Sequence, residues 1–230
     1  MSETLSPALI ENLRRLDSCA VSNAIESFGV RLRNEGFMDA RVRCVFPELP
    51  PVIGHAVTAT IRCSTPPPVG HVYKDRSDWW NHILETPKPR IVVVEDVDVN
   101  PGLGAFIGEV HANILRALGC VAYMTNGAVR DLPAVEQLGV QLFAGATSPS
   151  HAFVHIVSFG EPVHVGGLSI APGDLLFGDR HGVVSLPREV VRDLPSVVSD
   201  MHRRERRVIE YCRSANVSIE QLRSLVKDWD

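Results

Sequence analysis

The sequence predicts a mixed α/β domain with layered sheets, and three features of its pattern lead to this class. Residues 90–125 hold a β-branched run, a segment of helical period and a second apolar run, which together indicate a βαβ unit. Residues 151–186 are short apolar segments separated by glycine-containing turns, a pattern typical of antiparallel strands. Amphipathic segments at both ends predict flanking helices.

The elements of the first part alternate between helices and strands. In chain order we expect helices at 7–16 and 21–28, strands at 55–61 and 90–97, a helix at 109–118, and strands at 120–125 and 140–144. Asp131 is placed to cap a short helix that ends at Gly139.

The later part changes to antiparallel strands and then to helices. Pro187 is placed at the start of a helix that runs to about Cys212, and Ser218 begins a capping box for a last helix. We expect a single domain over residues 1–230, with an α/β half at about 40–150, an antiparallel segment at 151–186 and C-terminal helices at 187–230.

Composition narrows the classes of function. The chain has 230 residues, 22% of them charged, and a formal net charge of −4, so no overall positive field favours nucleic acid or an anionic membrane as a partner. No apolar run approaches the roughly 20 residues that span a bilayer, and acidic residues near the N-terminus are unlike a signal peptide, so we expect a cytoplasmic protein. The five cysteines include no CxxC pair, which argues against a disulfide framework or a cysteine zinc site.

The most informative segment for chemistry lies between residues 101 and 131. Gly108, Glu109, Val110 and His111 stand at a strand-to-helix transition, where the first N–H groups of a helix attract an anion such as a carboxylate or phosphate. Arg130-Asp131 follows the next strand, and the carboxyl ends of neighbouring parallel strands meet at one edge of a sheet. We therefore expect the two loops to be neighbours.

The Arg130-Asp131 pair has two interpretations. A guanidinium fork can clamp a carboxylate beside a carboxylate that binds a hard cation, which suits a metal-assisted reaction on a 2-oxo acid. A plain alternative is a local ion pair in which Asp131 only caps the following helix.

These residues resemble a known family. The stretch GEVHANILRALGCVAYMTNGAVRD is similar to the signature of the RraA-like family, and PVHVGGLSIAPGDLLFGDRHGVVSLP resembles that family's later glycine-rich pattern. The family includes class II 4-hydroxy-4-methyl-2-oxoglutarate aldolases, which also decarboxylate oxaloacetate, and the regulator of ribonuclease E activity. The resemblance implies a ββα swivelling-type domain assembled as a homotrimer or homohexamer, with sites at subunit boundaries.

The resemblance also implies roles for individual residues. The function that it implies is a Mg²⁺- or Mn²⁺-dependent lyase that releases pyruvate from a small 2-oxo acid. The implied roles are metal binding for Asp131, substrate binding for Arg130, support of the metal's water shell for Glu109, receipt of the substrate carboxylate by the loop of Gly108, Val110 and His111, and a metal contact from a neighbouring subunit for Glu205.

Other candidates have alternative interpretations. His151 and His155 share a face of a predicted strand and form, with His181, either a second ligand set or simply satisfied histidines. Trp79-Trp80 is core or subunit interface, or else a lid over the substrate. For the whole chain, the competing functions are a non-catalytic protein that binds and regulates a ribonuclease or another partner, and an enzyme acting on a sugar-acid derivative.

Overall fold

Four parallel strands form the centre of one mixed sheet, in the spatial order β6, β5, β3, β2. They are β2 (Val52–Arg62), β3 (Arg90–Asp96), β5 (Cys120–Val129) and β6 (Gln141–Thr147). The helices between successive strands are α3 (Arg76–Glu85), α4 (Glu109–Ala117) and α5 (Leu132–Gln137). The computed structural model, which describes residues 5–68 and 76–227, thus confirms the mixed α/β class and the predicted βαβ unit.

Antiparallel strands extend the two sides of this parallel centre. They are β1 (Arg43–Cys44), β7 (His155–Phe159), β10 (Leu175–Asp179) and β11 (Gly182–Ser185), while β8 (Val163–Val165) and β9 (Leu168–Ile170) form a separate hairpin. β10 pairs with the first half of β2 and β7 with its second half. The antiparallel segment is as predicted, but β1 and the short parallel strand β4 (Ala105–Ile107), which pairs with β5, were not.

Each face of the sheet is covered by a different layer. Helices α3, α4 and α5 cover one face, where Trp79, Leu115 and Tyr123 are fully buried. The β8–β9 hairpin covers the other face of the central strands. Trp79 is 1% exposed and lies in the core, and Trp80 is partly buried against the same cluster, which fits the prediction that the pair is core or subunit interface.

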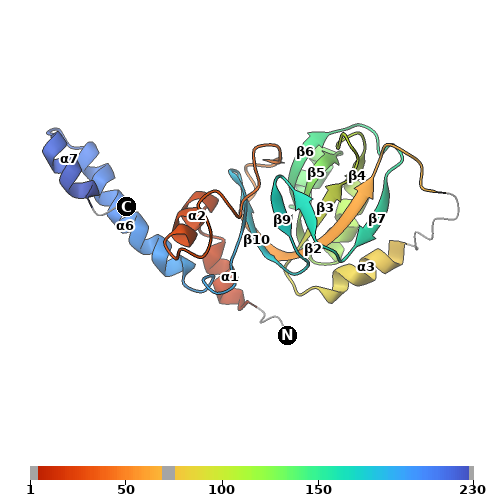
Figure 1. Cartoon of the computed structure of the whole chain (residues 1–230), viewed down its shortest axis with the longest axis horizontal. Helices are drawn as coiled ribbons and strands as arrows, with labels where there is room; N and C mark the ends of the chain where they lie inside the picture. The colour runs from red at the N-terminus through yellow and green to blue at the C-terminus, as the bar shows by residue number, and fades with distance from the viewer. Residues whose placement is uncertain (1–4, 69–75, 228–230) are drawn as a thin grey trace.

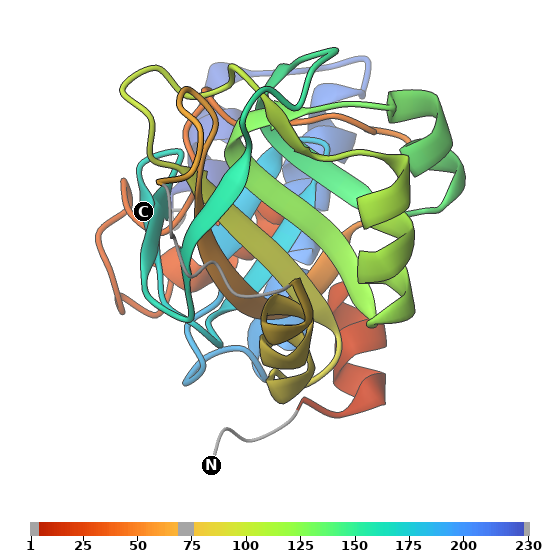
Figure 2. The ribbon, with the colours of Figure 1, turned by 90° about the vertical axis from the view of Figure 1, so that its right-hand side faces the viewer.

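The terminal helices form a third packed region against β10 and β11. It is formed by α1 (Pro7–Leu13), α2 (Ser18–Glu26) and the first turns of α6 (Leu194–Cys212), while α7 (Ile219–Val226) packs on α6. Figure 1 shows α6 and α7 projecting away from the sheet, and Figure 2 shows the terminal helices behind it. No helix in the described part of the chain is both long and apolar enough to cross a membrane.

The start of the long C-terminal helix differs from the prediction. Residues 187–193 form turns closed by short-range bonds from the Val190 N–H to the Pro187 carbonyl and from the Asp193 N–H to the Val190 carbonyl, and α6 begins only at Leu194. Val190 is buried in the core there, so packing decides the turn, and Pro195 occupies the first helical turn instead of Pro187. The predicted cap of the last helix is confirmed, since the Gln221 N–H donates to the Ser218 hydroxyl at 3.2 Å.

Candidate active site

The loops before α4 and after β5 are neighbours, as the sequence predicted. The Arg130 N–H donates to the Ile107 carbonyl at 3.2 Å, which ties the end of β5 to the end of β4. The Glu109 N–H, the first of α4, then donates to Asp131 Oδ2 at 3.0 Å. The two predicted segments therefore join through a carboxylate at a helix N-terminus, where the helix dipole favours negative charge.

Asp131 stands at the N-cap position of α5, as predicted, but its side chain does not cap that helix. Its side chain makes no capping bond to α5, and only its carbonyl accepts the Ala134 and Val135 N–H groups. Its backbone is left-handed, with φ 56° and ψ 37°, a conformation that costs most residues free energy but that Asp tolerates better than most. The capping interpretation is wrong because this conformation turns the carboxylate toward α4.

The pairing of Arg130 with Asp131 is loose. Arg130 Nε lies 3.7 Å from Asp131 Oδ2, and the two side chains are 35% and 44% exposed. A pair this exposed contributes only about 0–1 kcal/mol to stability. Among the described residues neither Asp131 Oδ1 nor the terminal guanidinium nitrogens of Arg130 has a hydrogen-bond partner, so both groups can bind a ligand.

Gly108 provides the space that lets the carboxylate reach the helix. A Cβ atom built on Gly108 would lie 2.5 Å from Asp131 Oδ2 and 2.9 Å from Arg130 Nε, both closer than real Cβ contacts. Any side chain at this position would displace the two groups. Sequence reasoning singled out Gly108 for its place before a helix, but this close approach could be found only in three dimensions.

The other residues in the first turn of α4 differ in whether their side chains face solvent or pack against β4. Glu109 and Val110 are exposed, and Val110, as the second helical residue, has no intrahelical acceptor for its N–H. The His111 ring turns back, with Nδ1 at 3.1 Å from the Phe106 carbonyl and its ring edge-to-face with Phe106 at 4.6 Å. The structure thus gathers Gly108, Glu109, Val110 and Asp131 around one helix start, while the His111 side chain is anchored to β4.

Glu205 does not belong to this group within one chain. It lies on α6, where with His202, Arg206 and Ile209 it lines a shallow hollow. Figure 1 places α6 on the opposite side of the molecule from β4 and β5. Its predicted contact across a subunit boundary remains a prediction.

The three histidines do not form a common ligand set. His155 pairs with Arg62 at the end of β2, whereas His181 follows β10, whose Gly178 pairs with Val52 at the start of β2. The eleven residues of β2 therefore separate them by roughly 30 Å at strand spacing. His151 stands outside the predicted strand, because Ala152 has a φ of 47° and β7 begins only at His155.

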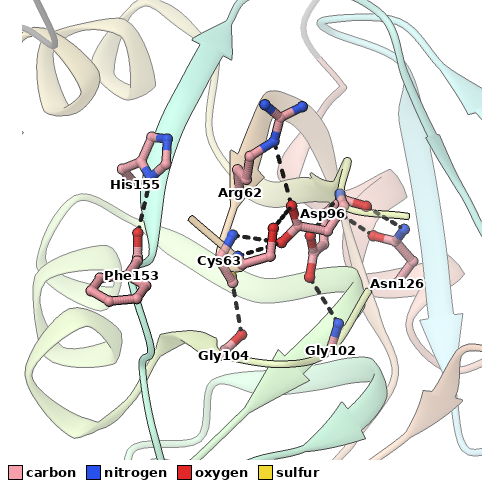
Figure 3. A network of polar contacts seen from close by, with 10 residues as sticks. Arg62, Cys63, Asp96, Gly102, Gly104, Asn126, Phe153 and His155 are labelled. Carbon is pink, nitrogen blue, oxygen red and sulfur yellow. Dashed lines mark hydrogen bonds and ion pairs between the residues drawn. The ribbon is translucent and has the colours of Figure 1, made fainter. Parts of the chain in front are cut away.

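One polar cluster was missed by sequence reasoning. Cys63, Asp96 and Asp98 place their sulfur and carboxylate oxygens within 4.8 Å of one another at the carboxyl ends of β2 and β3 (Figure 3). Burial raises the pKa of the Asp96 carboxyl. The available signal was an acidic residue that ends a continuous apolar strand, VVVEDVD, at the sheet edge where ligands bind.

Comparison with known proteins identifies the family. A protein of Halalkalibacterium halodurans whose name proposes a 4-hydroxy-4-methyl-2-oxoglutarate aldolase is 27% identical over 123 residues, covering 51% of this chain and 59% of that protein. The matched region thus spans less than two thirds of the length of this curated relative.

Solved structures share the fold at low identity. An uncharacterized protein from Pseudomonas syringae pv. tomato superposes with a TM-score of 0.73 at 20% identity, over 97% of this chain and 96% of that one. RraAS2 of Streptomyces coelicolor, described as an unusual member of the RraA family of RNase ES inhibitors, gives 0.69 at 21% identity, over 90% and 98%. The family described as RraA-like (Aldolase/RraA) matches residues 18–185, most of the chain and all of the site around α4 and Asp131. The chain belongs to the RraA-like family.

Proposed function

We propose that this protein is a divalent-metal-dependent lyase that releases pyruvate from a small 2-oxo acid. The observation that carries the proposal is the Asp131 carboxylate, which is fixed at the start of α4 by one oxygen and keeps the other free beside Arg130. The distant relative whose name proposes an aldolase supports the same reaction class. The two candidate reactions are retro-aldol cleavage of a 4-hydroxy-2-oxo diacid and decarboxylation of oxaloacetate.

The donor chemistry at Asp131 suits Mg²⁺ or Mn²⁺. Mg²⁺ in enzymes is commonly held by one or two carboxylates and keeps several waters, and Asp131 offers one partly exposed carboxylate oxygen. Glu109, exposed next to it, would hold part of the water shell, and Glu205 of a neighbouring subunit is the proposed further contact. When bound, such a cation supplies Lewis-acid polarisation of the C2 carbonyl.

The chain's own groups would bind and orient the substrate. The Arg130 guanidinium presents a planar fork that can hold the C1 carboxylate and the adjacent oxygen together. The N–H groups at the start of α4, from Val110 and His111, would receive the carboxylate where the helix dipole favours it. The hydrogen bonds from both sets of donors would strengthen as negative charge moves onto the enolate oxygen. Such donors lower the activation barrier in this way.

Both candidate reactions break the C3–C4 bond and leave its electrons on pyruvate enolate. In the retro-aldol branch the 4-hydroxyl must lose a proton, and a water oriented by the Glu109 carboxylate would accept it. The enolate then takes a proton at C3, and the other product leaves with a carbonyl at C4. In the decarboxylation branch carbon dioxide leaves instead, and no proton acceptor is needed before bond cleavage.

A pyruvate-release assay on chelated protein tests the proposal. Oxaloacetate and 4-hydroxy-2-oxo diacids should each be tried with and without Mg²⁺ or Mn²⁺, and we expect release only with metal. Because free divalent ions themselves promote decarboxylation of oxaloacetate, the rate must be compared with that of Asp131→Asn at equal metal. Equal rates for the two proteins on every substrate would contradict the proposal and favour the non-catalytic function, binding of a ribonuclease or another partner.

We further propose that the site is completed in a homotrimer or homohexamer. Glu205 lies on the projecting helix α6 and can approach a site only on another copy. Light scattering at micromolar concentration should give three or six times the monomer mass. A monomer that releases pyruvate would show that Glu205 is not required.

A further inference from the structure

The cluster of Cys63, Asp96 and Asp98 brings three segments of the chain together away from the proposed active site. Cys63 follows β2, Asp96 ends β3, and Asp98 lies in the segment that leads to β4. Cys63 and Asp96 are 0% and 2% exposed. The Asp98 side chain is 4% exposed, and its neighbours Arg62 and Ser64 are exposed, so solvent lies next to the cluster on that side.

The two carboxylates are held in fixed orientations by the backbone. Asp96 Oδ1 accepts the Asp98 N–H at 3.1 Å, and Asp96 Oδ2 accepts the Gly102 N–H at 2.8 Å. A carboxylate oxygen has two lone pairs, so each Asp96 oxygen keeps one. The Asp96 backbone is itself fixed by both ends of the Asn126 amide, which bind its N–H and its carbonyl (Figure 3).

Asp98 fixes the chain around Cys63. Its Oδ2 accepts the N–H groups of Cys63 and Ser64 at 2.7 and 2.8 Å, and its Oδ1 accepts the Ser64 hydroxyl at 2.6 Å. Arg62 adds an ion pair to Oδ1 at 3.4 Å. Because this last contact is long, Oδ1 keeps a lone pair toward the cluster.

The Cys63 thiol donates to the Gly104 carbonyl at 3.5 Å, so the buried group that lacks a partner here, within the described chain, is the Tyr123 hydroxyl. The Tyr123 side chain is fully buried on the same face of the sheet, and its hydroxyl has no hydrogen-bond partner among the described residues. Burial raises the pKa of Tyr123, a long contact with the Thr125 hydroxyl lowers it, and the charges of Cys63 and Asp96 raise it further, so the hydroxyl lies within electrostatic range of the cluster. Buried hydroxyls in native folds almost always bind a protein group, a water or an ion.

The charges of the cluster balance with one divalent cation. A Cys63 thiolate and the two carboxylates carry three negative charges, and Arg62 supplies one positive charge. A divalent ion supplies the other two, which avoids an uncompensated buried charge. A thiolate with carboxylates is a ligand set for Zn²⁺, whereas Mg²⁺ prefers oxygen ligands alone.

We propose that Cys63, Asp96 and Asp98 bind one Zn²⁺-type cation near the buried Tyr123 hydroxyl, as a site separate from Asp131. Asn126, which binds the Asp96 backbone, and Asp131 are five residues apart, roughly 15 Å at strand spacing. The cation ties the ends of β2 and β3 to the segment that leads through Gly102 and β4 to Gly108. Its role is structural, since every ligand comes from the buried chain.

Binding must release the thiol proton. A metal-bound thiol is deprotonated, so the cation would replace the Cys63 proton with a metal–sulfur bond. One proton leaves for each cation bound. The affinity should therefore rise with pH.

Cobalt provides a direct test, because Co²⁺ bound to a thiolate absorbs in the near ultraviolet. The experiment uses the full chain with Cys19 and Cys212, the two exposed cysteines, replaced by serine. We expect one equivalent of Co²⁺ to produce the thiolate absorption and one equivalent of Zn²⁺ to remove it. Cys63→Ser should abolish the absorption, while Cys120→Ser, a matched buried cysteine at the other end of the sheet, should retain it.

A second variant shows whether a loss of Co²⁺ binding comes from loss of a ligand or from misfolding. Asp96→Asn keeps the thiol and most of the hydrogen bonds, and it should weaken Co²⁺ binding at least tenfold with circular dichroism unchanged. Asp131→Asn should bind Co²⁺ at the cluster as the parent does, which separates this site from the proposed catalytic one. Absence of thiolate absorption in the folded parent, or equal absorption in folded Cys63→Ser, would overturn the proposal and leave a buried water as the partner of Tyr123.

Discussion

Two helices of this protein begin against a carboxylate that comes from a distant part of the chain. The first N–H of α2, from Ser18, donates to Asp179 at the end of β10 at 2.7 Å. The first N–H of α4, from Glu109, donates to Asp131 after β5 at 3.0 Å. Both carboxylates thus satisfy a helix N-terminus, but they differ in what else they bind.

Both carboxylate oxygens of Asp179 accept hydrogen bonds, whereas one oxygen of Asp131 has no partner among the described residues. The second oxygen of Asp179 accepts the Ser18 hydroxyl at 2.7 Å and the His181 N–H at 2.8 Å, and its side chain is 5% exposed. Asp131 uses one oxygen, is 44% exposed and lies beside a loosely paired Arg130. A carboxylate that accepts the first N–H of a helix can therefore have a purely structural role, as Asp179 does. It can bind a ligand only where, as in Asp131, one oxygen stays without a partner among residues 5–68 and 76–227.

The largest expected effect is on turnover after removal of the Asp131 charge. Asp131→Asn keeps an acceptor for the Glu109 N–H and tolerates the left-handed backbone, so the free energy of unfolding should change by less than about 1 kcal/mol. Metal-dependent pyruvate release should fall by about 10³-fold or more, because loss of the ligand removes a several kcal/mol contribution. Asp131→Ala should lose turnover equally and somewhat more stability. A folded Asp131→Asn with normal kcat would return Asp131 to a structural role like that of Asp179.

Arg130→Lys tests whether the planar shape of the guanidinium beside Asp131, and not only its positive charge, is needed for turnover. Lysine keeps the positive charge but loses the planar fork, so kcat should fall by about 10²–10³-fold, the cost of one oxyanion donor. The melting temperature should hardly change, since the exposed ion pair with Asp131 contributes little. Equal kcat for wild type and Arg130→Lys at saturating oxaloacetate and Mg²⁺ would exclude Arg130 from the mechanism.

Asp179→Ala should give the reverse pattern. The change leaves the Ser18 N–H and hydroxyl and the His181 N–H without their acceptor, which should lower the free energy of unfolding by about 3 kcal/mol. Pyruvate release per folded molecule should stay unchanged, measured below the melting temperature of the variant. A loss of kcat in folded Asp179→Ala would show that the two helix starts are coupled.

The sequence predicted β3, α4 and the end of β5 but not their contacts, and it placed the second helix at 21–28 although α2 begins at Ser18. The run of β-branched residues in β3, the helical period of α4 and the Arg130-Asp131 pair at the end of β5 are local patterns, so they could be read from spacing. The direction of the Asp131 side chain depends on its left-handed backbone, which no spacing reveals. Likewise, Ser18 and Asp179 are 161 residues apart, and only packing of α2 against β10 joins them.

The smallest expected effect is the pH dependence of the contribution that the Asp179 carboxylate makes to the free energy of unfolding. Burial opposes ionisation of Asp179, but hydrogen bonds from Ser18 and His181 and the charge of His181 outweigh it and hold its pKa below the usual value. The folded state therefore binds fewer protons at Asp179 than the unfolded state. The resulting stability is fully present above the unfolded pKa of about 4 and is lost as the pH falls through the folded pKa.

The measurement is the difference in free energy of unfolding between wild type and Asp179→Asn, from urea titrations between about pH 6 and pH 3. We expect a constant difference down to about pH 4 and a smaller one below it, because a protonated Asp179 resembles the amide. Asp96, whose pKa burial raises, should show the opposite slope in Asp96→Asn, since its ionisation destabilises the folded state as the pH rises. A gap for Asp179→Asn that widens on acidification would mean that burial, and not the helix N-terminus, governs Asp179.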